Sequence, residues 1–161
     1  MKQTHYPDLL PLQRQALDAA ARVMENAYNP YSHFYVGATL YGMHEKEGIL
    51  VSGANVENAA YGSCICAERS AILRANAQGL RKFYGIAIIA RGETFDTQEV
   101  TGPCGSCRQM LYELSQLSCC DLEIILSTTQ KDKIVITTIR ELLPLAFGPL
   151  DLGIDVARYQ K

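Results

Sequence analysis

Residues 84–90, YGIAIIA, form an almost continuous apolar run between two segments with helical character, and this run most constrains the fold. A strand with apolar side chains on both faces must be covered on both faces, which is typical of sheets packed between helices. A stretch rich in helix formers, 65–77, precedes it and stops near Gly79. Gly102-Pro103 then introduces another helix. The alternation predicts an α/β fold.

The other elements follow from the same kind of pattern. Apolar residues at spacings of three and four between 12 and 27 predict a helix that ends before Asn29-Pro30. Two β-rich runs, separated by a polar stretch that ends in glycine, predict a hairpin. The order predicts one domain, 1–161, built as a three-layer α/β/α sandwich around a mixed five-stranded sheet. The remaining expected elements are hairpin strands at 35–41 and 48–55, strands at 121–127 and 133–138, and a short helix at 139–144.

Composition and charge narrow the classes of partner. The 161 residues are 48% hydrophobic and 20% charged, as in an ordinary globular domain. With a formal net charge of -2, the chain lacks the concentrated positive charge that attracts a phosphate backbone, so we expect no nucleic-acid partner. The beginning of the chain lacks an apolar leader, and no run has the length of a membrane span, so we expect a cytoplasmic protein without a membrane partner. In a reducing compartment, six cysteines indicate metal ligands or reactive thiols rather than three disulfides.

Cys104 and Cys107 lie three residues apart at the start of a predicted helix. This spacing places both side chains on one helix face, where they can bind the same metal ion. A redox pair and two packed core residues are the alternatives for this pair taken alone.

Cys66-Ala67-Glu68 is the second motif whose side chains could take part in metal binding or catalysis. Residues two apart do not face the same way on a helix, so the thiol can bind a metal while the carboxylate stands beside it. The alternative is a core thiol followed by a solvated glutamate that favours the helix dipole. Three thiolates from the two motifs leave one coordination position open, as in catalytic zinc sites. A closed structural site, with Cys64 as fourth ligand, is the competing interpretation.

Five separated segments resemble one family in the same order along the chain. They are YSHFYVGA (31–38), GANVENAAYG (53–62), CAERSA (66–71), GPCGSCRQ (102–109) and RELLPLAFGP (140–149). The sequence is similar to the zinc-dependent cytidine deaminases, and to their small, homotetrameric, nucleoside-acting branch. The resemblance implies the cytidine deaminase-like fold, one Zn2+ per chain and a homotetramer.

The resemblance also implies roles at the metal. Cys66, Cys104 and Cys107 become the zinc ligands, with Cys64 left outside as a neighbouring buried thiol. Glu68 becomes the catalytic proton carrier. Arg69 offsets the negative charge of three thiolates around zinc, a role also expected of the two helix N-termini. Without the resemblance, Arg69 reads as a surface arginine.

On the substrate side, the resemblance assigns Asn55 and Glu57 to the ribose and Phe34 to the apolar wall against the pyrimidine. Ala67 joins these substrate-binding residues. Tyr61 and Phe147 are assigned to a neighbouring subunit's pocket. From the sequence alone, NVEN is only a turn and the three aromatic residues are core residues. Cys119 and Cys120 match no functional motif, so we expect them to pack.

The implied activity is hydrolytic deamination of cytidine and 2'-deoxycytidine to uridine and 2'-deoxyuridine, with release of ammonia, as in pyrimidine salvage. Zinc makes a water molecule reactive, and Glu68 carries its proton to ring N3 and then to the departing amino group. Two alternatives stay open: a deaminase of another aminopyrimidine nucleoside, such as a blasticidin-type antibiotic, and a structural zinc module that serves as a binding platform.

Overall fold

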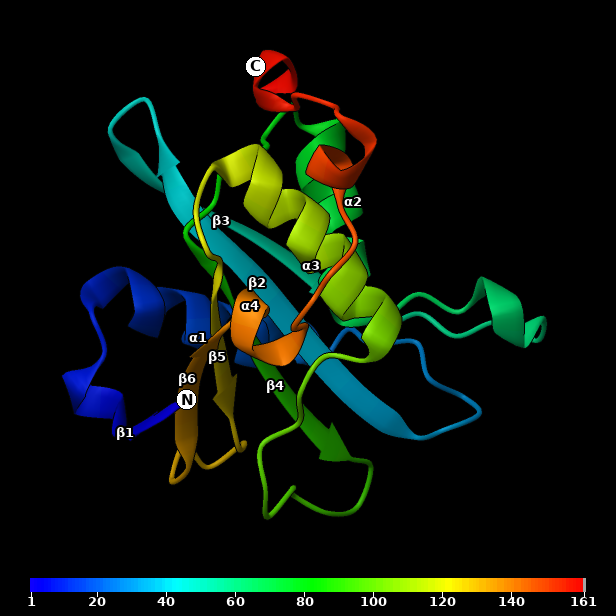
Figure 1. Ribbon diagram of the computed structural model, residues 1–161. Coiled ribbons are helices and arrows are strands. Elements are labelled where there is room, and N and C mark those ends of the chain that lie inside the picture. The colour runs from blue at the N-terminus through cyan, green and yellow to red at the C-terminus, as the bar shows by residue number, and fades with distance from the viewer. Residues whose placement is uncertain (161) are drawn as a thin grey trace.

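A computed structural model describes residues 1–160 of the chain (Figure 1). Helices and strands alternate along most of it, as the sequence predicts. The helices are α1 (Pro11–Met24), α2 (Ala67–Ala77), α3 (Gly105–Ser118) and α4 (Ile139–Leu142). The strands are β1 (Lys2–Thr4), β2 (Phe34–His44), β3 (Glu47–Ala54), β4 (Gly85–Gly92), β5 (Glu123–Ser127) and β6 (Ile134–Thr138).

The sheet is mixed, as expected, but it has six strands and not five, in the order β1-β6-β5-β4-β2-β3. β4 and β5 are parallel, and the other neighbouring pairs are antiparallel. The additional strand is β1, whose three residues pair with β6 from Thr4↔Ile134 to Lys2↔Ile136. A three-residue strand of polar side chains carries no apolar alternation, so periodicity gave no signal for it.

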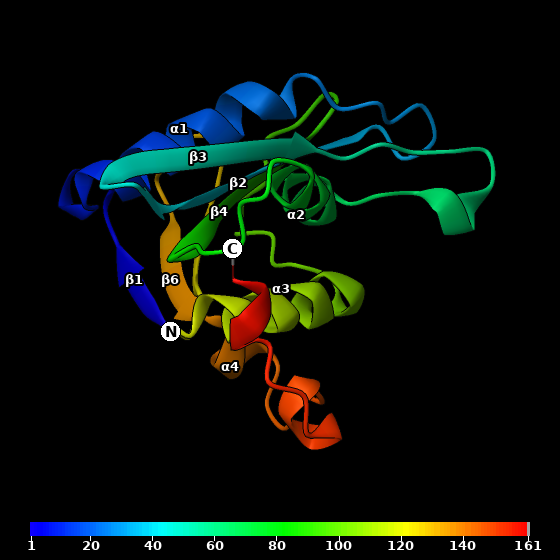
Figure 2. The same ribbon diagram turned by 90° about the horizontal axis from the view of Figure 1, so that it is seen from above.

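The two faces of the sheet pack against different helices. Successive residues of β4 divide between two hydrophobic clusters: Ile86 and Ile88 join the cluster that contains residues of α2, α3 and α4, whereas Ala87 and Ile89 join the cluster that contains residues of α1. This is the period of two expected for a strand. Figure 2 shows α1 on one side of the sheet, with α2 and α3 on the other. The apolar run at 84–90 is therefore covered on both faces, as predicted.

The hairpin is confirmed, and its strands extend further than the sequence pattern indicates. β2 and β3 pair from Gly37↔Ala54 to His44↔Glu47, so only Glu45 and Lys46 connect them. Both residues have positive φ, 49° and 73°, as two-residue hairpin turns require. Glutamate and lysine are not the usual residues of such turns, which is why the polar stretch read as a longer loop. The first helix was also predicted too long, since α1 ends at Met24, well before Asn29-Pro30.

Helix α2 lies directly on strand β3, and a glycine makes this approach possible. A Cβ atom at Gly53 would stand 2.7 Å from the carbonyl oxygen of Ala67 and closer still to the backbone nitrogen of Ala71. The contact fixes the first turn of α2 against the sheet. In the part of the chain that the structure describes, no helix has the length and apolar character needed to cross a membrane.

Candidate metal centre

Two helices begin at cysteines, and their starts meet. Cys66 is the N-cap of α2 and Cys104 is the N-cap of α3, while Cys107 lies in the first turn of α3. Both N-cap residues have extended backbone conformations, as N-caps do, and neither side chain caps its own helix. The thiols are therefore free for another partner at the positive ends of two helix dipoles, where thiolate charge is favoured.

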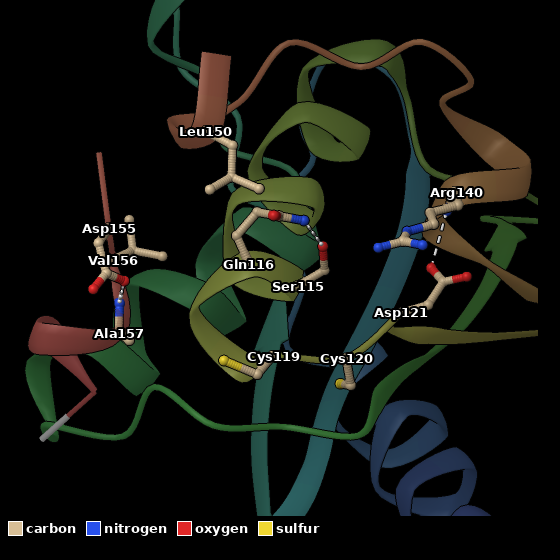
Figure 3. A pocket seen from close by; sticks show the side chains of 10 residues that line it. All are labelled: Ser115, Gln116, Cys119, Cys120, Asp121, Arg140, Leu150, Asp155, Val156 and Ala157. Carbon is tan, nitrogen blue, oxygen red and sulfur yellow. Dashed lines mark hydrogen bonds between the residues drawn. The ribbon is translucent and has the colours of Figure 1, made fainter. Parts of the chain in front are cut away.

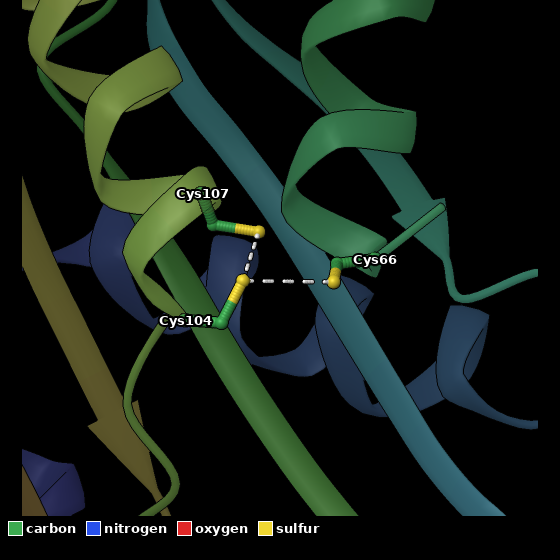
Figure 4. Close-up of side chains that lie close together, drawn as sticks. All are labelled: Cys66, Cys104 and Cys107. Atoms are coloured by element: carbon green, nitrogen blue, oxygen red, sulfur yellow. Dashed lines mark hydrogen bonds between the residues drawn. The ribbon is translucent and has the colours of Figure 1, made fainter. Parts of the chain in front are cut away.

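The three sulfur atoms form one cluster (Figure 4). The Sγ atom of Cys104 lies 3.5 Å from that of Cys107 and 3.9 Å from that of Cys66. All three sulfur atoms lie within 4.8 Å of one another. Three convergent thiols are a donor set suited to zinc, which binds sulfur at about 2.3 Å. The cluster is graded in exposure, because Cys107 is buried, Cys66 is partly buried and Cys104 is exposed.

The thiols are already polarised by their surroundings. Hydrogen bonds from Cys107, Arg69 and Cys104 lower the pKa of the Cys66 thiol to about 5, despite the opposing effect of its burial. The pKa of Cys107 is raised, because its proton is shared with Cys66 and because it is buried. One thiolate thus forms readily in the cluster, and a thiolate is the form that binds metal.

Cys64 is not part of the cluster. Its Sγ atom accepts a hydrogen bond from the backbone nitrogen of Asn58 at 3.4 Å and lies 3.7 Å from the carbonyl oxygen of the same residue. The Cys64 side chain therefore stabilises the loop that leads to α2, and it is partly exposed rather than buried as expected. A closed site of four cysteines does not form among residues 1–160.

Arg69 contacts the cluster from the first turn of α2. Its Nη2 atom donates to the carbonyl oxygen of Cys64 at 2.7 Å and contacts the Cys66 sulfur at 3.8 Å. Its Nε atom is buried without a hydrogen-bond partner among the described residues. A guanidinium in this position is placed for the charge-offsetting role that the family resemblance implies.

Glu68 is the carboxylate beside the cluster, and only 4% of its surface is exposed. Burial raises the pKa of Glu68, and the neighbouring Cys66 thiolate raises it further. A buried carboxyl with a raised pKa holds a proton more readily than an exposed one, which favours general acid–base work.

Comparison with known proteins identifies the family. Residues 11–120 match the model described as the cytidine and deoxycytidylate deaminase zinc-binding region. The chain belongs to this deaminase family. The matched residues include all three cysteines of the cluster, so zinc is the metal that the cluster fits.

Individual deaminases are similar over most of the chain. The cytidine deaminase of Halalkalibacterium halodurans is 42% identical over 134 residues, which cover 83% of this chain and 92% of the relative. A crystal structure of cytidine deaminase from Burkholderia pseudomallei has a TM-score of 0.71 and 41% identity, over 83% of this chain and 97% of the other. Cytidine deaminase from Mycobacterium tuberculosis gives a TM-score of 0.63 at 30% identity, over 83% and 95% of the two chains.

Asn55 and Glu57, which the family resemblance assigns to ribose, bind the backbone of the 31–36 segment in this structure. The Asn55 side chain donates from Nδ2 to the carbonyl oxygen of Phe34 at 2.9 Å and accepts from the backbone nitrogen of Val36 at 2.8 Å. The Oε2 atom of Glu57 accepts from the backbone nitrogens of Tyr31 and Ser32, at 2.9 and 3.1 Å. Both residues therefore hold the segment that carries Phe34, a contact that the sequence did not reveal.

The other predicted site residues of this deaminase lie at different depths. Phe34 is partly buried at the start of β2, and the side chain of Ala67 is fully buried in the core. Tyr61 and Phe147 are 73% and 60% exposed, so neither is the core aromatic that the sequence alone suggests. The Tyr61 ring instead stands edge-on to Tyr31, with 5.7 Å between ring centroids.

The expectation for the adjacent cysteines is only half right. Cys120 packs against a core cluster, whereas Cys119 is exposed and ends α3 in a left-handed conformation, with φ at 53°. Both line a cavity of about 430 Å³ between the end of α3 and the C-terminal segment (Figure 3). None of the three zinc-binding cysteines lines this cavity, so it is separate from the metal centre.

Proposed function

We propose that this protein is a zinc-dependent cytidine deaminase, which hydrolyses cytidine and 2'-deoxycytidine to uridine and 2'-deoxyuridine with release of ammonia. The observation that carries the proposal is the cluster of three thiols, without a fourth among residues 1–160, next to a buried carboxylate with a raised pKa. Such a cluster leaves a coordination position open, as catalytic zinc sites do.

We assign Cys66, Cys104 and Cys107 to the metal and Glu68 to proton transfer. Zinc, when bound, supplies a Lewis acid that lowers the pKa of water to about 7. The Glu68 carboxylate accepts a proton from the water that adds to C4 of the cytosine ring, and its protonated form donates to N3. Glu68 then takes the remaining proton from the C4 hydroxyl group and passes it to the amino group, so the C4–N bond breaks, ammonia leaves and the C4 carbonyl forms. The positive charge of Arg69, which contacts the Cys66 sulfur, reduces the electrostatic repulsion between the closely spaced thiolates.

For the substrate, we assign Phe34 to the face of the pyrimidine and Asn55 and Glu57 to the ribose, and we keep Ala67 among the substrate-binding residues. Glu57 retains Oε1 for a sugar hydroxyl, since its two backbone hydrogen bonds both go to Oε2. Its pKa is lowered, because hydrogen bonds from Ser32 and Tyr31 outweigh the effect of burial. A carboxylate near the sugar also disfavours phosphorylated substrates.

We further propose a homotetramer in which Tyr61 and Phe147 complete a neighbouring subunit's pocket. Their exposure supports this role, because it leaves both rings available for contact with another chain. The one-domain, three-layer arrangement belongs to the same proposal and is supported by the division of the core between two clusters. The expected cytoplasmic location stays a prediction.

The test is to incubate the zinc-loaded protein with cytidine, 2'-deoxycytidine, their 5'-monophosphates, blasticidin S and adenosine, and to follow ammonia release. We expect release from the two cytosine nucleosides. Release from monophosphates alone, or from blasticidin S alone, would overturn the substrate assignment. Size-exclusion mass should correspond to four chains, and a fully active monomer would exclude shared pockets.

A further inference from the structure

Cys104 is the most exposed ligand of the proposed zinc site, so packing alone does not fix its position. Its main chain is instead held on both sides by one residue, Arg108. The backbone nitrogen of Arg108 donates to the carbonyl oxygen of Cys104 at 2.9 Å, as the first turn of α3 requires. The side-chain Nε atom donates to the carbonyl oxygen of Pro103, also at 2.9 Å. Both peptide groups that flank the Cys104 Cα atom are therefore bound by Arg108.

The equivalent position before Cys66 is held differently. There, Ile65 and Val56 form an isolated β-bridge, in which each backbone nitrogen donates to the other's carbonyl oxygen at 2.9 Å. The residues before Cys104 form a loop, and the carbonyl of Pro103 is bound by a side chain. Arg108 thus does for the second N-cap cysteine what a β-bridge does for the first.

The same guanidinium reaches a third carbonyl group. Its Nη1 atom donates to Leu142 at 2.9 Å, at the C-terminal end of α4, where carbonyl groups lack helical partners. The rigid fork of an arginine can bind two carbonyl oxygens in fixed directions, whereas a lysine ammonium acts as a single point. Arg108 is partly buried and therefore ties the loop before Cys104 to a packed element.

We propose that Arg108 is a positioning residue for the zinc centre, which holds the main chain of Cys104 in the orientation that lets its thiolate bind the metal. The inference rests on the proposed zinc ligands and not on the substrate. Residues that orient metal ligands typically contribute about 10- to 100-fold in metal affinity.

The experiment is a zinc competition titration of the purified protein against a chromogenic chelator, with Arg108→Met, Arg108→Lys and Arg74→Met variants. Arg74 is a matched control, because its Nη1 also donates to a backbone carbonyl, that of Ser52 at 3.2 Å, but from the last turn of α2. We expect about 10- to 100-fold weaker zinc binding in Arg108→Met. Arg108→Lys should lie between this variant and the wild type, since lysine keeps the charge and loses the fork.

A second control tests whether loss of any side-chain contact near the start of α3 weakens zinc binding. Gln109 donates to the carbonyl oxygen of Phe147 at 2.9 Å, so Gln109→Ala should keep wild-type zinc affinity. Equal zinc affinities for Arg108→Met and Arg74→Met would overturn the proposal. If Arg108→Met does not fold, wild-type zinc affinity in Arg108→Lys would overturn it as well. Because zinc affinity is read without substrate, failure here is distinguishable from failure of the deaminase assignment.

Discussion

At the scale of single residues, the site lies where the core meets solvent. Glu68 and Cys107 are buried, while Cys104 is exposed at the other side of the same cluster. This gradient suits hydrolysis, because the carboxylate needs a dry environment to raise its pKa and the metal needs access for water and substrate. The proposed proton transfer therefore depends on α2 directing the Glu68 side chain into the protein interior.

Glu68→Gln should separate metal binding from turnover. The glutamine has nearly the same shape but cannot accept and release the proton, so we expect turnover of cytidine to fall by roughly two to four orders of magnitude. Zinc content, measured by atomic absorption, should stay at one ion per chain, because Glu68 lies outside the thiol cluster. A variant that keeps wild-type turnover would remove Glu68 from the mechanism.

Asn55→Ala should weaken substrate binding in two ways, by removing the proposed sugar contact and by releasing the Phe34 segment. The two contributions can be separated with 2',3'-dideoxycytidine, which lacks the sugar hydroxyls. If Asn55 also acts through Phe34, its loss raises KM for this analogue too, and the effect shrinks in a Phe34→Ala background. A penalty that disappears completely with the analogue would show that Asn55 affects substrate binding only through the sugar.

The sequence was informative about this site wherever spacing alone decides geometry. Cys104 and Cys107 share a helix face because they are three residues apart, and Cys66 and Glu68 diverge because they are two apart. The sequence did not reveal that Asn55 and Glu57 bind the 31–36 backbone, because that contact depends on how a loop folds back onto a strand end. For the same reason, the bond from Arg108 to α4 was not foreseen.

At the scale of elements, α2 and α3 act as the two halves of the metal site, because each begins at an N-cap cysteine. The N-termini of the two helices meet only if each helix is held at the right position relative to the sheet. For α2, this position is set by the close approach of its backbone to β3 at Gly53, where a side chain has no room. The six-stranded sheet thus acts as a rigid base for the zinc ligands.

Gly53→Ala should therefore damage both stability and zinc binding. The added Cβ would overlap the backbone of Ala67 and Ala71, and overpacking of this kind typically costs about 1–3 kcal/mol. Urea unfolding and zinc content report the two effects. Gly62→Ala is the matched control, since a Cβ atom there meets nothing within 4 Å. Equal unfolding free energies for the two variants would contradict the proposed role of the Gly53 contact.

At the scale of the whole molecule, the first ten residues close one edge of the sheet and join distant segments. β1 pairs with β6, and the Tyr6 hydroxyl donates to Oδ2 of Asp18 at 2.8 Å. Asp18 also forms an ion pair with Lys131, with 2.6 Å between Nζ and Oδ1. Asp18 thus connects α1 to the N-terminal segment and to the turn between β5 and β6.

This connection predicts an acid dependence of stability. Burial pushes the pKa of Asp18 upward, but hydrogen bonds from Lys131 and Tyr6 outweigh it, so the pKa lies below its ordinary value of 3.8. A depressed carboxyl pKa contributes stability above the unfolded value that is lost as the pH falls through the folded value. Asp18→Asn should therefore lower the unfolding free energy at pH 7 and differ less from the wild type below pH 4. Asp8→Asn, at an exposed position, is the control; a constant difference across this pH range would contradict the assignment.

We propose that zinc is held by three thiolates and keeps one coordination position without a protein sulfur. X-ray absorption spectroscopy of the zinc-loaded protein at the zinc K edge tests it directly. We expect three sulfur neighbours at about 2.3 Å and one lighter neighbour at about 2.0 Å. Four sulfur neighbours would show a closed structural site and would contradict the proposed catalysis.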